Sequence, residues 1–192
     1  MVIGDEITRL ERIVQDFLQF ARPSEPELVA IPVERLFDEV RGLLEAQLKK
    51  TAIELKTGPA NAAWVRADPQ QIKQVLINLV QNAADSIGRN GVITLRARNG
   101  AVSRRKGAGD IVVLQVIDSG KGIPLEVRKR LFDPFFTTQE GGTGLGLPIA
   151  ARIVEKHGGQ LRYQTELGRG TTFNVILPCF HEPETENPAD RR

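Results

Sequence analysis

The sequence predicts an α+β fold in which a long amphipathic helix precedes a domain of further helices and short strands. Three observations support this prediction. Apolar residues recur at spacings of three and four in several long segments, as in helices packed on a core. Shorter alternating or fully apolar runs between them are typical of strands. The composition, 41% hydrophobic and 26% charged, is that of an ordinary globular protein.

Composition also excludes several classes of function. A net charge of +2 is too small to indicate nucleic-acid binding by itself. No apolar run approaches the ~18–20 residues of a membrane span, and no signal peptide opens the sequence. Cys179 is the single cysteine, which excludes an intrachain disulfide and a cysteine-based metal module. We therefore expect a cytoplasmic protein that makes no membrane contact through this segment.

The first element is a helix over residues 3–21, whose apolar side chains form one stripe. Pro23 and Pro26 then forbid its continuation. A helix this apolar needs a partner, either its own domain or another helix. Because a proline-bearing linker follows it, we favour a homodimer or bundle through residues 3–21. A second amphipathic helix is expected over 33–50.

The next segment contains two short strands and a well-marked helix start. Strands are expected at 53–57 and 63–67, with a turn between them. Asp68 can cap the following helix, Pro69 suits its first position, and Gln71 can complete a capping box. This helix runs to about Ile87.

The remaining elements follow the same patterns, and no internal repeat is present. A polar loop over 100–109 carries a basic triplet that we interpret as a solvated hairpin tip. From Cys179 onward the sequence is charged and proline-bearing, which predicts disorder. Strands are expected at 92–99, 111–118, 161–165 and 172–177, and helices at 125–131 and 144–157.

The first candidate for chemistry is a polar wedge on the helix after Asp68. Asn78, Asn82 and Asp85 fall on one side of the helix, away from its apolar stripe. A solvated face is the simpler interpretation. The functional one is a site where an amide oxygen on a rigid helix binds Mg²⁺, which takes few protein ligands and keeps water and phosphate oxygens.

The second candidate begins where an apolar strand ends in Asp118, followed by Gly120 and Gly122. These residues are common in turns. Alternatively, the carboxylate accepts a hydrogen bond from the exocyclic amine of a base, and the glycines allow the backbone to approach a ring.

A glycine-rich stretch, Gly141-Gly142-Thr143-Gly144-Leu145-Gly146-Leu147, opens the helix over 144–157. Glycine is conformationally costly at a helix start, whereas backbone N–H groups there bind anions. The order fits neither a P-loop nor a Rossmann fingerprint. We therefore favour phosphate binding by another architecture. The aromatic segment Phe132–Thr138 just before it is either a local apolar plug or a lid.

Taken in order, these stretches resemble the catalytic ATP-binding domain of bacterial sensor histidine kinases. This family belongs to the GHKL group, with gyrase B-type topoisomerases, MutL-type repair proteins and the heat-shock-ninety chaperones. Asn78–Asp85 is similar to the N box, Asp118–Pro124 to the first glycine box, and Phe132–Thr138 to the F box. The second glycine box is similar to Gly142–Leu147, and a final glycine-threonine turn to Gly168–Phe173. The nitrogen-regulation subtype is the most similar.

The resemblance implies the Bergerat ATP-binding fold, a two-layer α/β sandwich in which a mixed sheet of about five strands carries helices on one face. It also implies ATP or ADP as ligand, and Mg²⁺ bound by Asn82. It implies that Asp118 receives the adenine amine, helped by a hydroxyl such as that of Thr172, and that Asn78 is a nearby polar contact. The complete set implied to bind the nucleotide is Asn78, Asn82, Asp85, Asp118, Gly120, Gly122, Ile123, Phe135, Gly142, Thr143, Gly144, Leu145, Gly146 and Thr172.

The resemblance extends to the N-terminus. The segment Leu10–Pro23 is similar to the second helix of the dimerisation and histidine-phosphotransfer hairpin, and the first helix, with the phosphoacceptor, is not in this sequence. His157 matches a structural position of the family, and His181 lies in a polar tail. The acceptor histidine must therefore come from another segment or chain, and a response regulator receiver domain would take the phosphoryl group in a phosphorelay.

Domain boundaries follow from the same comparison: a partial phosphotransfer helix and linker over 1–27, the catalytic domain over 28–178, and a tail over 179–192. Two departures from the family pattern are Asp85, where a basic group is common, and Gln139, which follows the two threonines where the subtype often has a basic residue. Lys121, Arg128, Lys129 and Arg130 are nearby charges that can compensate.

Two other functions compete with this interpretation. One is a non-catalytic ATP-binding dimerisation module that signals by conformation. The other is an ATP-driven clamp of the topoisomerase or chaperone kind, or a serine kinase of the anti-sigma type. Residues 69–77 carry only glutamines and a lysine as polar groups, so no candidate catalytic glutamate precedes Asn78, which argues against self-contained hydrolysis.

Overall fold

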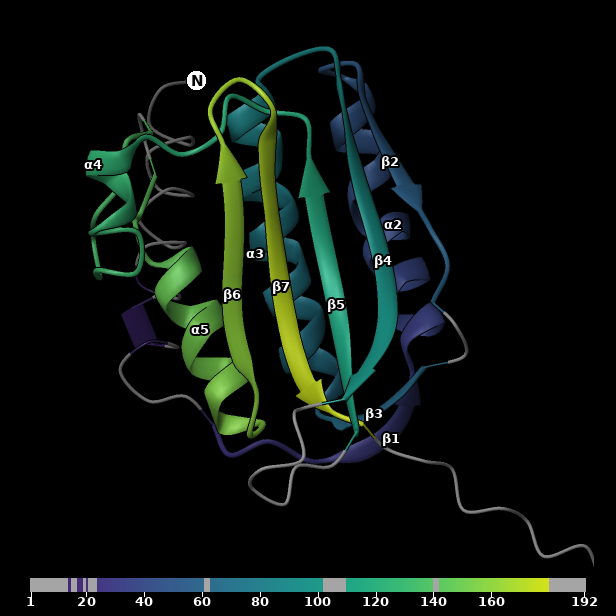
Figure 1. The fold of residues 1–192 in the computed structure, drawn as a ribbon. Coiled ribbons are helices and arrows are strands. Elements are labelled where there is room, and N and C mark those ends of the chain that lie inside the picture. Colours follow the sequence, from purple (N-terminus) through teal and green to yellow (C-terminus); the bar gives the residue numbers. More distant parts are fainter. Residues whose placement is uncertain are drawn as a thin grey trace, which may run out of the picture.

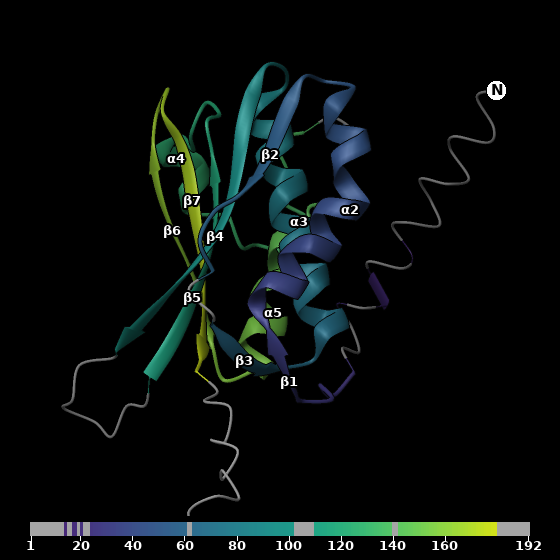
Figure 2. The ribbon, with the colours of Figure 1, turned by 90° about the vertical axis from the view of Figure 1, so that its right-hand side faces the viewer.

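The computed structural model describes residues 14, 17, 18, 20, 24–60, 63–101, 110–139 and 142–179. These residues form a five-stranded sheet in the order β2-β4-β5-β7-β6 and a separate two-stranded sheet of β1 and β3. The helices α2, α3 and α5 lie together on one face of the larger sheet (Figures 1 and 2). The predicted two-layer α+β architecture with a mixed sheet is thereby confirmed.

The larger sheet is mixed because one edge strand runs parallel to its neighbour. β2 (Ile53–Thr57) pairs in parallel with β4 (Gly91–Ala101). β4, β5 (Asp110–Asp118), β7 (Gly170–Pro178) and β6 (Gln160–Glu166) then pair antiparallel in that order. All five strands were expected, and each extends one or more residues beyond its predicted range except β2.

The smaller sheet was not expected in full. β1 (Val29–Pro32) pairs antiparallel with β3 (Trp64–Ala67), and β1 was not among the predicted strands. The strands on either side of the predicted turn, β2 and β3, therefore belong to different sheets. The connection between them crosses from the parallel edge of the large sheet to the small sheet below the helices (Figure 2).

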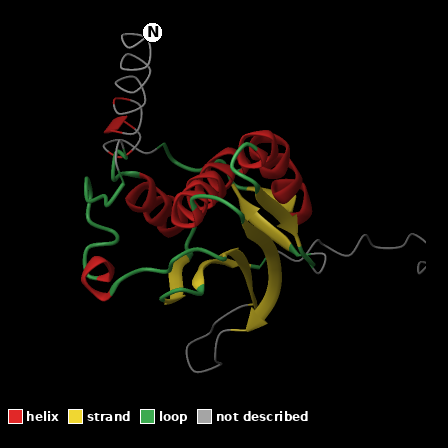
Figure 3. Ribbon diagram, turned by 90° about the horizontal axis from the view of Figure 1, so that it is seen from above, coloured by secondary structure: helices red, strands yellow, loops and turns green. Residues whose placement is uncertain are grey.

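The helical layer consists of α2 (Val33–Lys49), α3 (Pro69–Ile87) and α5 (Gly146–Lys156), and a short α4 (Leu125–Arg128) lies apart from it. Seen from above, the helices form one layer over the strands (Figure 3). Their apolar stripes meet the sheet in one core, in which Leu36, Leu76 and Leu145 are fully buried. The sheet thus supports α3 and α5 side by side, and these two helices carry most of the polar residues singled out in the sequence.

The start of α3 follows the sequence prediction in part. Asp68 caps the helix through Oδ1, which accepts hydrogen bonds from the backbone N–H groups of Gln70 (2.9 Å) and Gln71 (3.1 Å). The predicted capping box is wrong. The side chain of Gln71 donates to Ser24 instead, and the N–H of Asp68 donates to the imidazole of His157. A tertiary partner has replaced the local one.

Several predictions concern residues outside the described ranges. The four described residues of the predicted helix over 3–21, Val14, Phe17, Leu18 and Phe20, are helical, and the first three are about half exposed (49–56%). The basic triplet of the 102–109 loop and the tail after Cys179 are not described. Among the described residues, no helix has the length and apolar character required to cross a membrane.

Candidate functional site

A cavity of about 520 Å³ lies between α3, the end of β5, α4, the segment 131–139 and the start of α5. Ten of the fourteen predicted nucleotide-binding residues line it: Asn78, Asn82, Asp85, Asp118, Gly122, Ile123, Gly142, Thr143, Gly144 and Gly146. Residues separated by up to 68 positions are thus gathered around one space. A second hollow, of about 650 Å³, lies beside α5 and β6, and none of the predicted residues lines it.

Asp118 is the most buried acid of the cavity wall, with 6% of its surface exposed. It ends β5, and its Oδ1 accepts hydrogen bonds from the backbone N–H groups of Gly120 (2.8 Å) and Thr171 (3.2 Å). Burial raises the pKa of the Asp118 carboxyl above its ordinary value, and these two hydrogen bonds act in the opposite direction. Because both bonds go to Oδ1, Oδ2 is the oxygen available to a ligand.

Two glycines allow this tight arrangement around Asp118. Gly170 has a φ of +111°, and a Cβ there would meet the Asp118 carbonyl oxygen. Gly122 has a φ of +72°, and a Cβ there would meet the backbone of Glu166. Glycine at 170 therefore allows β7 to approach the end of β5, which brings the Thr171 N–H to the carboxylate, and glycine at 122 allows the loop after β5 to approach the end of β6.

Asn78 serves the structure of the site rather than a solvated face. Only 8% of it is exposed, its Nδ2 donates to the carbonyl oxygen of Gly146 (3.1 Å), and its Oδ1 accepts from Nε2 of Gln74 (2.9 Å). The side-chain amide of Asn78 thus joins α3 to the first turn of α5. The three residues of the predicted polar wedge all line the cavity, but Asn78, the first of them, is buried against α5.

Asn82 and Asp85 continue the same side of α3 into the cavity. Asn82 is half-buried and Asp85 is exposed. The carbonyl oxygen of a half-buried asparagine beside an open cavity fits a Mg²⁺ ligand, because this ion prefers oxygen donors and keeps several waters. Among the described residues no group of three or more His, Cys, Asp or Glu side chains surrounds a common point. An ion held here would therefore depend on ligand oxygens as well as protein ones.

The glycine-rich turn forms the opposite wall. Gly142, Thr143, Gly144 and Gly146 line the cavity, whereas Leu145 is fully buried beneath it. The turn is fixed by a backbone hydrogen bond from Phe135 to the carbonyl oxygen of Gly144 (3.1 Å). Helix α5 has no capping side chain, so the backbone N–H groups of its first turn need other partners. Phosphate oxygens are suitable partners for such groups.

Four predicted residues do not lie on the wall. Thr172 does not line the cavity, whereas its neighbour Thr171 does. Side chains alternate along β7, and that of Thr171 lies on the helix side of the sheet. Phe136 lines the cavity and Phe135 does not, because Phe135 adopts a φ of +65° and is 59% exposed. Leu145 and Gly120 act from behind, the former in the core and the latter through its bond to Asp118.

Other wall residues were not assigned as ligand contacts. Lys121 lies on the wall with Ile77, Leu131 and Phe173, and the guanidinium of Arg130 lies 4.3 Å from the ring centre of Phe136. The apolar members could be found only from the three-dimensional arrangement, since in the sequence they belong to ordinary core stripes. The charge of Lys121 was noted in the sequence, and the cavity places it beside Gly122.

The layered fold and this cavity define a nucleotide-binding ATPase domain. Residues 67–180 match the Histidine kinase-, DNA gyrase B-, and HSP90-like ATPase family, and the chain belongs to this family. The sensor histidine kinase ZraS of Escherichia coli (strain K12) is 36% identical over 178 residues, which cover 92% of this chain and 37% of that protein. The chain thus spans less than half the length of the curated relatives that it matches.

Solved structures give the same assignment. Full-length ShkA in complex with AMPPNP superposes with a TM-score of 0.76 at 28% identity, over 90% of this chain and 36% of that one. The histidine kinase ThkA in complex with the response regulator protein TrrA gives a TM-score of 0.72 at 33% identity, over 93% of this chain and 50% of that one. This chain is therefore a catalytic ATP-binding domain of the histidine kinase type.

Proposed function

We propose that this chain is the catalytic part of a two-component sensor kinase that transfers the γ-phosphoryl group of ATP to a histidine on another segment or chain. The observation that carries the proposal is the position of Asp118. Its carboxylate is held at the end of β5 by two backbone N–H groups and faces a cavity whose other walls carry Asn82 and the glycine turn of α5. The carboxylate can accept a hydrogen bond from adenine. The amide oxygen of Asn82 suits a metal ion bound to phosphate, and the N–H groups at the start of α5 suit free phosphate oxygens.

The roles of the wall residues follow from their chemistry. Oδ2 of Asp118 accepts a hydrogen bond from the exocyclic amine of adenine, and the backbone of Gly122 lies beside the base. The first turn of α5 donates N–H groups to phosphate oxygens. Mg²⁺, held by Asn82, supplies charge neutralisation for the phosphates when it is bound. Lys121 adds a positive charge on the same wall, which offsets the acid of Asp85.

The acceptor cannot be His157. That residue is buried, and each of its ring nitrogens already has a partner in the protein. His181 lies outside the described residues. In the transfer step, an imidazole nitrogen supplied by another segment attacks the γ-phosphorus, the bond to the β-phosphate oxygen breaks, and ADP leaves. Gln74, the polar wall residue ahead of Asn78 on α3, is an amide and cannot activate water. This favours transfer over hydrolysis.

The wider assignments are proposals of the same kind. We place the catalytic domain at residues 28–178, a partial phosphotransfer helix and linker at 1–27, and a tail at 179–192. We also propose that the chain works in the cytoplasm, where ATP is available, and that the phosphoryl group passes on to a response regulator. The complex of the similar kinase ThkA with TrrA supports this partner class.

Calorimetric titration with ADP and ATP, with and without Mg²⁺, tests the nucleotide site. We expect saturable binding that strengthens with Mg²⁺ and weakens about 10- to 100-fold in Asp118→Asn, the range for a lost hydrogen bond to a charged group. Asp38→Asn is the matched control, since Asp38 lies on the exposed side of α2. Unchanged binding in Asp118→Asn, or no binding at all, would contradict the proposal.

Adding a polypeptide that carries an acceptor-histidine helix separates a kinase from a binding module. A kinase incorporates acid-labile phosphate into that polypeptide, and this chain alone incorporates none. ATP consumption without any acceptor would favour the clamp type of ATPase instead.

A further inference from the structure

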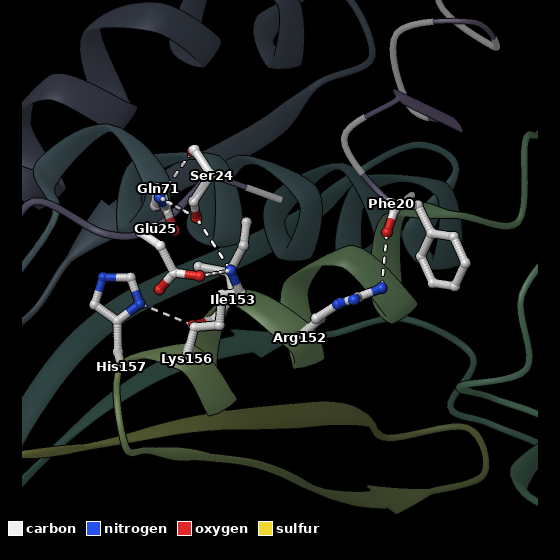
Figure 4. Close-up of polar contacts among 8 residues, drawn as sticks. All are labelled: Phe20, Ser24, Glu25, Gln71, Arg152, Ile153, Lys156 and His157. Atoms are coloured by element: carbon white, nitrogen blue, oxygen red, sulfur yellow. Dashed lines mark hydrogen bonds and ion pairs between the residues drawn. The ribbon is translucent and has the colours of Figure 1, made fainter. Parts of the chain in front are cut away.

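A short segment that begins in the last turn of the N-terminal helix is fastened to α3 and α5 by polar contacts. We call this segment, Phe20 with Ser24–Glu27, the linker. Nη1 of Arg152 donates to the carbonyl oxygen of Phe20 (2.8 Å), and Nζ of Lys156 forms an ion pair with Oε1 of Glu25 (2.8 Å). Arg152 and Lys156 are one helical turn apart on α5, and both point toward the linker (Figure 4). They form a two-point clasp.

Helix α3 completes the docking surface. Nε2 of Gln71 donates to the carbonyl oxygen (3.3 Å) and the hydroxyl (3.2 Å) of Ser24. The backbone N–H of Glu27 donates to Oδ2 of Asp68 (3.1 Å). The linker thus bridges the end of α5 and the start of α3, two places far apart in the sequence (Figure 4).

Residues Ser24–Glu27 are held by polar contacts alone, whereas the ring of Phe20 packs partly buried against the core. The side chain of Glu25 is 88% exposed, and residues 24–30 contribute no buried apolar side chain. Oε1 of Gln71 is buried without a hydrogen-bond partner, an arrangement that undocking would relieve by admitting water. Contacts of this exposed, charged kind are weak and sensitive to salt.

The same helix α5 begins in the nucleotide cavity. Its first residue, Gly146, lines the cavity, and no side chain caps this end. The clasp residues lie one to three turns further along the same short helix. Asn78 ties Gly146 to α3, and Leu145 and Ile149 are buried at this end of the helix. Helix α5 is therefore one packed element that extends from the cavity to the clasp.

We propose that linker docking and nucleotide binding are positively coupled through α5. Both events place contacts on this one helix, so whichever occurs first helps to hold α5 in the position that the other requires. Linkage makes the effect reciprocal: nucleotide tightens the linker, and the docked linker tightens nucleotide binding by the same factor. The contacts of the clasp therefore become tighter when nucleotide occupies the cavity, and this change reaches the N-terminal helix to which the linker is joined. This inference rests on the proposed nucleotide site.

Hydrogen exchange of the linker tests the coupling in the full chain. We expect AMPPNP with Mg²⁺ to slow exchange of residues 24–27 several-fold in the wild type. Lys156→Glu opposes Glu25 and should abolish this slowing and weaken AMPPNP binding about two- to fivefold. The charge-swapped Glu25→Lys/Lys156→Glu pair should restore both. Arg98→Glu, an equal change of charge on the exposed side of β4, is the control.

The outcomes distinguish the two proposals. If AMPPNP binds and linker exchange does not slow, or if the charge-swapped pair behaves like Lys156→Glu, the coupling is overturned and the nucleotide site stands. If AMPPNP does not bind to the wild type, the proposed function is overturned and the coupling falls with it.

Discussion

Asp118 is placed to bind a ligand, but burying its carboxylate lowers the stability of the fold. Its carboxyl is nearly fully buried, which raises its pKa, and the Gly120 and Thr171 N–H bonds only partly offset this effect. The folded protein therefore holds the Asp118 proton to higher pH than the unfolded chain does. The result is a residue whose charge serves a ligand and does not serve stability.

Asp118→Asn should accordingly separate stability from binding. At neutral pH we expect its free energy of unfolding to equal or exceed that of the wild type by up to about 1 kcal/mol, because a neutral amide is cheaper to bury and still accepts both N–H bonds. The difference should vanish below the ordinary Asp value of 3.8 and grow as pH rises through the titration of the carboxyl. Urea unfolding at several pH values measures it, and a variant that is less stable at neutral pH would contradict this account.

The sequence located residues of the cavity wall where their chemistry pointed to them, and missed others where the direction of the side chain decided their position. Asp118, Asn82 and four glycines could be selected because their types suit a nucleotide. The choice of Thr172 over Thr171, and of Phe135 over Phe136, depended on which face of the backbone each side chain leaves. That direction is set by the pairing of β7 with β5 and by the left-handed turn at Phe135, and neither is visible in composition.

At the scale of elements, the seam between α3 and α5 organises the site. Near one end of the seam, Asn78 joins α3 to Gly146. At the other end, Nε2 of His157 accepts from the N–H of Asp68 (3.0 Å), and its Nδ1–H donates to the carbonyl oxygen of Ile153 (2.8 Å). This geometry needs a neutral imidazole protonated on Nδ1. The two helices are thereby fixed to each other at both ends, with the cavity near the Asn78 end.

His157→Phe tests the closed end of the seam. The substitution keeps an aromatic ring and removes both hydrogen bonds, leaving the Asp68 N–H without its acceptor. We expect a loss of about 2–3 kcal/mol in the free energy of unfolding, in the range for lost hydrogen bonds and an unsatisfied buried donor. Chemical denaturation measures this loss, with Lys50→Ala at an exposed position as control. A loss below about 0.5 kcal/mol would show that the His157 bonds do not hold the seam.

Elements with strong periodicity were predictable and those defined by pairing were not. The apolar stripes located α2, α3 and α5, and Asp68 with Pro69 fixed the start of α3. β1 escaped prediction because four residues with two prolines nearby carry no pattern of their own, and the strand exists only by pairing with β3. The capping box failed for the same reason: Gln71 and the Asp68 N–H found partners at a distance.

At the scale of the whole molecule, three of the four described residues of the N-terminal helix lie outside the core, and the fourth, Phe20, packs against it. The buried apolar residues of the described chain run from Ile31 to Leu177, and Val14, Phe17 and Leu18 are about half exposed. These three side chains share one helical face at spacings of three and four. Exposed apolar residues aligned in this way indicate a surface that another helix covers.

We predict that this face mediates self-association. Sedimentation velocity of the full chain should show a dimer that forms with rising concentration. Val14→Glu/Leu18→Glu should remain monomeric with an unchanged melting temperature, because it puts charges on the association face and leaves the core intact. Leu43→Glu is the matched control, since Leu43 is equally exposed (59%) but lies on α2. A dimer that persists in the double variant, or is lost in Leu43→Glu, would place the contact on the catalytic domain. The linker clasp would then not be connected to a dimer of N-terminal helices.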